Sequence, residues 1–107
     1  MSETHPAIDL GAMKAAAAQA CALLKLLANQ DRLLLMCQLS QGERCVSDLE
    51  TQLGIRQPTL SQQLGVLREN GLVTTRREGK SIFYSIASQE ALAVMAVLYE
   101  QFCANTK

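Results

Sequence analysis

Apolar residues recur at helical spacing along most of the chain. The first such stretch begins near Asp9, and its stripe would contain Leu10, Met13, Ala17, Ala20, Leu24 and Leu27. The next stretch, "DRLLLMCQLSQG", is apolar nearly all round, which is typical of a buried helix. We expect this second helix to start at Asn29 or Gln30 and to end near Gly42.

Two shorter helices follow, separated by a very short turn. In "CVSDLETQLG", Ser47 and Glu50 have the spacing of a capping box, and Gly54 suits the end of the helix. In "IRQPTLSQQLGVLRENG", a proline suits the first turn and a glycine suits the end. The buried stripe of that fourth helix is predicted to be Leu60, Leu64 and Leu67.

The last part of the chain predicts a β-hairpin and one more helix. "LVTTRREGKSIFYSIA" reads as two short strands around a Glu-Gly-Lys turn. Ser88 then caps a helix over "QEALAVMAVLYEQFCAN". The stripe of this helix is Leu92, Met95, Tyr99, Phe102 and Cys103, so we expect Cys103 to face inward.

The order α-α-α-α-β-β-α, mainly α with one hairpin, predicts a winged helix-turn-helix. We detect no internal repeat and no linker, so residues 1–107 form one predicted domain, with residues 1–8 as a loose tail. The chain is 49% apolar but only 4% aromatic, without Trp, which points to an aliphatic, helix-rich core. A domain of this size is only marginally stable alone, which favours a dimer.

The composition also bears on location and redox state. No uninterrupted apolar run approaches 18 residues, and the N-terminus lacks a signal-peptide pattern, so we expect a cytoplasmic protein without a membrane span. Thiols are kept reduced there. The four cysteines therefore predict free thiols, metal ligands or redox sites, not a disulfide framework.

The net charge is zero, yet the charges are unevenly spread. Residues 55–87 carry five basic and two acidic side chains, a net charge of +3, while the rest carries five basic and eight acidic ones. A local basic face is the electrostatic feature expected of a DNA-binding segment.

The residue types on the fourth helix point to DNA reading. Its outward face would hold the uncharged donors and acceptors Gln57, Thr59, Ser61, Gln62 and Gln63, followed by Arg68. A merely solvated face would be richer in Glu and Lys. The hairpin carries Arg76, Arg77 and Lys80, which as a "wing" would touch phosphates or the minor groove. The simpler reading of the hairpin is a solvated turn.

The stretch "LLKLLANQDRLLLMCQL…VSDLETQLGIRQPTLSQQLGVLRENGLVTTRREGKSIFYSI" resembles the ArsR/SmtB family of winged-helix repressors across nearly the whole chain. Within that family, "QPTLSQQLGVLRENGLV" followed by "TRR…IFY" is similar to the BigR-like, persulfide-sensing repressors. The resemblance implies a homodimer joined by the first and last helices. It also implies a repressor of double-stranded operator DNA that leaves its operator when an inducer acts.

The same resemblance implies a sensor. "RLLLMCQL" and "LYEQFCANTK" match the two cysteine positions of the persulfide-sensing members, which assigns the pair to Cys37 and Cys103. The implied inducer is a low-molecular-weight persulfide or polysulfide, and the implied targets are sulfide detoxification genes. Cys21 and Cys45 have no counterpart in that pair, and Cys37 taken alone also fits plain core packing.

A metal-responsive repressor is the alternative within the family. The arsenic type of site would need a second cysteine where Ser47 follows Cys45 and Val46, and a thiolate with a hydroxyl is a poor soft-metal site. The zinc type of site needs Asp and His on the last helix, and residues 88–107 contain neither. The one histidine, His5, lies in the predicted tail. We therefore predict no metal and no cofactor.

Two other classes of protein are weaker matches. A thiol redox enzyme would need a Cys-x-x-Cys motif or a nucleophile with an adjacent base, and the sequence has neither, so we predict no catalytic residues. An interaction module with a degenerate winged helix would not need the uncharged reading face or the Arg-Arg hairpin.

Overall fold

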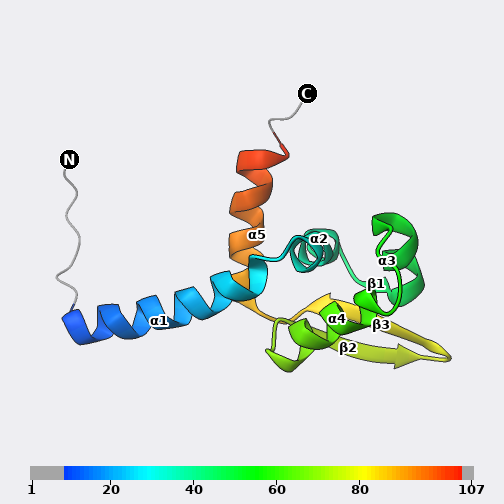
Figure 1. Ribbon diagram of the computed structural model, residues 1–107, viewed down its shortest axis with the longest axis horizontal. Helices are drawn as coiled ribbons and strands as arrows, with labels where there is room; N and C mark the ends of the chain where they lie inside the picture. The colour runs from blue at the N-terminus through cyan, green and yellow to red at the C-terminus, as the bar shows by residue number, and fades with distance from the viewer. Residues whose placement is uncertain (1–8, 105–107) are drawn as a thin grey trace.

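The computed structural model describes residues 9–104. The tail of residues 1–8, with His5, lies outside that range. Within these residues, five helices and three strands follow one another in the order α1 (Leu10–Leu27), α2 (Gln30–Leu39), β1 (Arg44–Cys45), α3 (Val46–Leu53), α4 (Thr59–Glu69), β2 (Val73–Glu78), β3 (Ser81–Ile86) and α5 (Gln89–Phe102). Figure 1 shows α1 extending from one side of the molecule and the β2–β3 hairpin from the other. This is a winged helix-turn-helix, as predicted.

Three helices begin at polar side chains that the sequence marked as starts. Asp9, Asn29 and Ser88 each accept a hydrogen bond from the backbone N–H three residues later, at 3.0 Å in every case. Each oxygen satisfies a donor that has no partner inside its helix, an interaction that contributes about 1 kcal/mol. The predicted starts of α1, α2 and α5 are thus confirmed.

The predicted capping box of α3 is wrong. The helix begins at Val46, directly after Cys45, and no side chain in the described range caps it. Ser47 already lies inside the first turn, with its Oγ 3.3 Å from the Sγ of Cys45. The cause is that Cys45 belongs to a strand, so extended backbone passes straight into the helix without a capping residue. The predicted end of α3 is correct, because Gly54 adopts the left-handed conformation, with φ 70°.

The sheet has one strand more than the sequence predicted. The strand order is β1-β3-β2, and both neighbouring pairs are antiparallel. β2 and β3 form the predicted hairpin, with Glu78 opposite Ser81 and Gly79 and Lys80 in the turn. The extra strand β1 has two residues, with Arg44 opposite Tyr84 and Cys45 opposite Phe83. It fixes the base of the hairpin to the start of α3.

The core lies between α2, α3, α4 and the base of the hairpin. Leu35, Leu49, Leu60 and Leu67 are fully buried, and aliphatic side chains from every one of these elements surround them. The predicted stripe of α4 is confirmed, since Leu64 is buried as well. α2 is less uniformly buried than its composition predicted, because Leu34 lies on the solvent side.

Most of α1 is not covered by other residues between 9 and 104. Leu27 is its only buried residue within the described range, while Leu24 is 54% and Met13 48% exposed. Figure 1 shows the helix meeting the body only near its C-terminal end, beside α2. By length and composition this helix could also cross a membrane, which the sequence analysis did not expect. One such helix is weak evidence for a span, because the core helix of a soluble protein and a signal sequence pass the same test.

The last helix is buried on one side only. Ala91 and Met95 lie in the core, whereas Leu92, Tyr99 and Phe102 are exposed. Cys103 ends the helix and is exposed too, so in the isolated chain it does not face inward as its stripe predicted. The stripe of α5 continues past the edge of the core, and its last turn lies beside Leu33 and Cys37 of α2.

Candidate functional site: a DNA-reading surface and a thiol pocket

The predicted reading face of α4 is largely open to solvent. Gln57 precedes the helix and is exposed, as are Ser61, Gln62 and Arg68, while Thr59 is half-buried. The buried leucines of α4 lie on its opposite side, so burial of that stripe turns the uncharged polar side chains outward. The Ser61 hydroxyl donates a hydrogen bond to the Gln57 side-chain oxygen, which orders both groups at the start of the helix.

Gln63 differs from its neighbours because its side chain is hydrogen-bonded to another helix. Arg32, in the first turn of α2, donates from Nη1 to the Gln63 Oε1 at 2.9 Å. The same guanidinium donates from Nε to the carbonyl of Leu26 at 2.6 Å, near the end of α1. Gln63 therefore joins α4 to α1 and α2 through Arg32. The sequence analysis did not assign Arg32 a role, since only the fold brings it to Gln63.

The wing arginines are not equivalent. Arg76 donates to both carboxylate oxygens of Glu43, at 2.8 and 2.9 Å, and to Glu78 at 2.8 Å. Its guanidinium also lies 4.7 Å from the ring centre of Phe83. The hydrogen bonds from Arg76 lower the pKa of Glu43, so this carboxylate stays ionised. The charge of Arg76 is thus largely offset by two acidic neighbours.

Arg77 and Lys80 are the cations that the wing leaves available. Both are exposed, at the tip and flank of the hairpin, and neither forms an ion pair with a residue between 9 and 104. Strand alternation places Arg77 on the face opposite to Arg76. Of the three predicted wing contacts, these two are the ones that a phosphate could approach without displacing a carboxylate.

Cys37 and Cys103 line one pocket. This thiol pocket has a volume of about 340 Å³ and is formed by Leu33, Cys37, Leu98, Tyr99, Phe102 and Cys103. Leu33 and Cys37 are one turn apart on α2, while Leu98 and Phe102 are one turn apart on α5, so two helix faces enclose the space. The structure therefore brings together two cysteines that are 66 positions apart in the sequence.

The two thiols differ in their surroundings. Cys37 is half-buried and packs against the core, whereas Cys103 is exposed. Burial raises the pKa of Cys37 above its ordinary value, and the neighbouring charge of Cys103 raises it further. The second cause is consistent with the pocket that the two cysteines share.

The other two cysteines lie elsewhere. Cys21 is exposed on α1, and Cys45 lines a separate pocket between the start of α3 and the hairpin, with Glu50 and Lys80. Within residues 9–104 no three His, Cys, Asp or Glu side chains gather in a way that could hold a metal ion.

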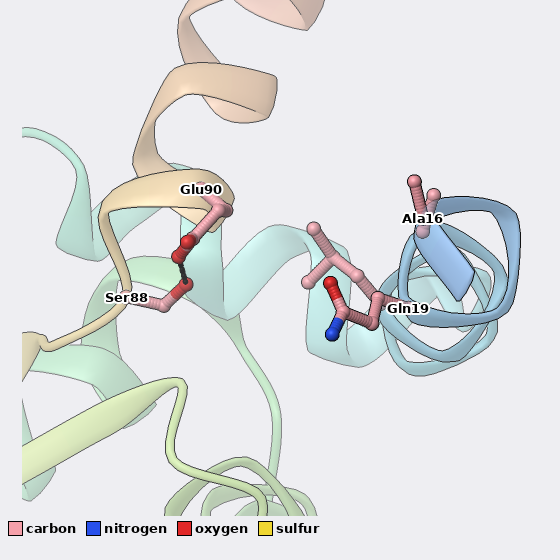
Figure 2. A pocket seen from close by; sticks show the side chains of 6 residues that line it. Ala16, Gln19, Ser88 and Glu90 are labelled. Carbon is pink, nitrogen blue, oxygen red and sulfur yellow. Dashed lines mark hydrogen bonds between the residues drawn. The ribbon is translucent and has the colours of Figure 1, made fainter. Parts of the chain in front are cut away.

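A third hollow separates α1 from the beginning of α5. It is lined by Ala16, Gln19, Ala20, Leu23, Ser88 and Glu90. Figure 2 shows Gln19 reaching from α1 toward the end of α5 that carries Ser88 and Glu90, whose side chains are joined by a hydrogen bond. The small alanine side chains leave this space open, and it carries no thiol or cation. It belongs to the uncovered face formed by α1 and α5.

A helix-turn-helix whose second helix exposes uncharged polar side chains, with a basic hairpin beside it, defines a winged helix-turn-helix regulator. Regulators of this class bind DNA. The family model "Bacterial regulatory protein, arsR family" matches residues 29–75, which extend from the start of α2 into β2. The chain belongs to the arsR family of bacterial regulatory proteins, in agreement with the resemblance in its sequence.

Similar proteins extend the likeness beyond that segment. The biofilm growth-associated repressor of Agrobacterium fabrum is 56% identical over 97 residues, covering 91% of this chain and 83% of the relative. The crystal structure of the transcriptional repressor BigR from Xylella fastidiosa superposes with a TM-score of 0.80 at 50% identity, covering 89% and 94% of the two chains. A homodimeric winged helix-turn-helix domain from Mycobacterium bovis, described as a possible ArsR-family regulator, has a TM-score of 0.71 at 33% identity, covering 90% and 89%.

Proposed function

We propose that this protein is a dimeric repressor that binds operator DNA with its thiols reduced and leaves it when sulfur links Cys37 to Cys103. The observation that carries the proposal is the thiol pocket, where the two cysteines lie on facing sides of α2 and α5. The genes it would control are those of sulfide detoxification. The term "repressor" comes from the names of two similar proteins, at 56% and 50% identity.

The DNA-binding half of the proposal rests on α4 and the wing. Ser61 and Gln62 present donors and acceptors of the kind that contact base edges, and Arg68 adds a cation at the end of the helix. Arg77 and Lys80 would hold the phosphate backbone beside them. Two copies would read two half-sites about one helical turn apart.

The dimer half rests on uncovered apolar surface. Leu10, Met13 and Leu24 on α1 are exposed, as are Leu92 and Val97 on α5. Burying one such side chain contributes about 1.5–3 kcal/mol, so a face with several of them is costly to leave in water. A second copy is the proposed cover, and a related winged helix-turn-helix domain is described as homodimeric.

The sulfur chemistry can be written so that it balances. A thiolate attacks the outer sulfur of a persulfide R–S–SH, the S–S bond breaks, and the thiolate RS⁻ leaves, which gives Cys–S–SH. The second thiolate then attacks the cysteine sulfur and expels HS⁻, which closes a disulfide. If both cysteines first become persulfides, the same displacement gives a trisulfide. A disulfide needs Cα atoms within about 7 Å, and each added sulfur extends the reach by about 2 Å.

Release of DNA would follow because the bridge connects α2 to the end of α5. Cys37 is on α2, which packs against α4, while Cys103 ends α5, part of the proposed dimer surface. A covalent link changes the packing of α5 against α2 and with it the separation of the two α4 helices in the dimer. Because half-site spacing is geometrically strict, a small rotation weakens binding.

The direct experiment compares reduced and persulfide-treated protein on operator DNA. We expect the treated protein to lose its gel shift and to yield a peptide in which Cys37 and Cys103 are joined. Release by a metal ion, without a bridge, would instead assign the protein to the metal-responsive regulators. DNA release with both thiols unmodified would reject the sensor pair.

The pocket predicts a pH dependence for Cys37. Because its pKa is raised, the thiol form persists at neutral pH, and alkylation of Cys37 by iodoacetamide should accelerate only as the pH rises past the ordinary cysteine value of 9.0. In Cys103→Ser one of the two causes is removed, so the midpoint should move down while burial keeps it above that value. Mass spectrometry of the Cys37 peptide across pH gives both midpoints. An unchanged midpoint in Cys103→Ser would mean that the sulfurs do not interact.

The same raised pKa indicates an order of attack. Burial raises the pKa of Cys37 and limits access to its sulfur, so the exposed Cys103 is the proposed first nucleophile and Cys37 the one that closes the bridge. In Cys37→Ser a persulfide should therefore accumulate on Cys103. Accumulation of persulfide on Cys37 in Cys103→Ser at a greater rate would reverse the order.

The contrast among the wing cations predicts different salt dependences of DNA binding. Arg77→Gln and Lys80→Gln should each remove two phosphate contacts per dimer and flatten the slope of log K against log salt by about 1.8. Arg76→Gln should leave that slope nearly unchanged, because Glu43 and Glu78 already hold Arg76. Titrations of the same operator at several salt concentrations supply the slopes. A loss of slope in Arg76→Gln equal to that in Arg77→Gln would show that DNA displaces the carboxylates.

A further inference from the structure

The lining of the thiol pocket has a chemistry of its own. Around the two thiols lie the side chains of Leu33, Leu98, Tyr99 and Phe102, with no carboxylate, amine or guanidinium among them. A charged group that entered this space would lose hydration without gaining a partner, which is unfavourable. An alkyl or aryl group would instead exchange water for contact with leucine and aromatic surface.

The volume matches a small organic molecule. About 340 Å³ lies within the range of sites for small molecules, and the mouth is bordered by Phe102, which is 72% exposed. A persulfide with a short hydrocarbon tail could place the tail against the leucines while its S–S bond meets Cys103. A tail that carries carboxylates would have to remain outside, with its sulfur held less closely.

We propose, resting on the sensor function above, that this pocket selects persulfides whose organic group is small, apolar and uncharged. The reacting sulfur is the same in every donor: the Cys103 thiolate takes the outer sulfur of R–S–SH and the thiolate RS⁻ leaves. The selection lies in how closely the pocket holds R. Cys37 then closes the bridge with loss of HS⁻, whichever donor supplied the sulfur.

A pair of donors that differ in one end group, a methyl or a carboxylate, tests this. n-Propyl persulfide and 2-carboxyethyl persulfide, each generated in solution, are mixed at pH 7 with the reduced full-length protein. The formation of the Cys37–Cys103 peptide is followed by mass spectrometry. Each rate is divided by the rate of the same donor with N-acetylcysteine, which removes intrinsic reactivity. The normalised rate for the propyl donor should be higher by about tenfold, as expected for one unpartnered polar group.

A variant with a cation at the pocket mouth should change the selection. Phe102→Lys is expected to speed bridging by the carboxylate donor. The ratio of the normalised propyl rate to the normalised carboxyethyl rate should therefore fall several-fold. Gln101→Lys adds the same charge on the neighbouring residue, which does not line the pocket, and should leave the ratio unchanged. This pair separates an effect of the lining from a general effect of charge on α5.

The possible failures are distinct. Equal normalised rates for the two donors in the unaltered protein would overturn the selection while leaving the sensor pair intact, because the bridge still forms. Equal responses of Phe102→Lys and Gln101→Lys would also overturn it. No bridge with either donor would instead reject the sensor function on which the selection depends.

Discussion

Replacement of either sensor cysteine should leave a repressor that can no longer be induced. Cys37→Ser and Cys103→Ser keep α4 and the wing intact, so both should bind operator DNA with affinity close to that of the unaltered protein. Persulfide treatment should lower the affinity of the unaltered protein for operator DNA by on the order of 10- to 100-fold, the usual range of coupling between two sites. The same treatment should change the affinity of each variant by less than about twofold, since no bridge can close.

The matched controls are the two remaining cysteines. Cys21 lies on α1 and Cys45 at the start of α3, and neither lines the thiol pocket. Cys21→Ser and Cys45→Ser should release DNA as fully as the unaltered protein does. Because Cys37 packs against the core, Cys37→Ala serves as a second variant in case the serine hydroxyl disturbs folding. Full release in both Cys37→Ala and Cys103→Ser would reject the assignment.

The second large effect concerns the uncovered face of α1. Met13→Glu combined with Leu24→Glu places two charges where the proposed dimer buries apolar side chains. We expect a monomer in sedimentation experiments, and operator affinity lower by about 100-fold or more, because two linked reading heads bind far more tightly than one. Far-UV circular dichroism should remain close to that of the unaltered protein, since neither side chain belongs to the core.

The control for that experiment puts a charge on the other side of the same helix. Ala15 is exposed and lies far from the stripe of Met13 and Leu24 around the helix axis. Ala15→Glu should therefore stay dimeric and bind DNA normally. A dimer that persists in the double variant would show that α1 does not carry the contact, and a monomer in Ala15→Glu would show that charge alone is responsible.

The elements of the fold were predictable where local signals decide them. The capping side chains of α1, α2 and α5, the stripe of α4, and the hairpin around Gly79 all depend on residues within one or two turns of each other. The errors occur where a distant segment intervenes. β1 exists because β3, some forty residues later, offers it a partner, and that pairing moved the start of α3 and removed the predicted cap at Ser47.

The candidate site also has parts that local sequence predicts and parts that depend on distant segments. The outward polar face of α4 follows from its buried leucines, and so could be predicted locally. The ion pair between Arg76 and Glu43 joins residues 33 positions apart, which no local pattern reveals. The choice of Cys37 and Cys103 came from the resemblance to a family, and the common pocket now adds a geometric reason for it. The exposure of Cys103 in one chain reflects a stripe that runs beyond the core.

The guanidinium of Arg32 has a mechanical consequence. It spans three helices, since it joins the carbonyl end of α1 and the Gln63 side chain of α4 while its own backbone belongs to α2. Besides the bond to Gln63, it donates to the backbone carbonyls of Leu26 and Lys25 near the end of α1. The proposed dimer helix α1 and helix α4 are therefore coupled through the side chain of Arg32. A rotation of either helix that stretches its hydrogen bond to Arg32 also strains the contact of Arg32 with the other helix.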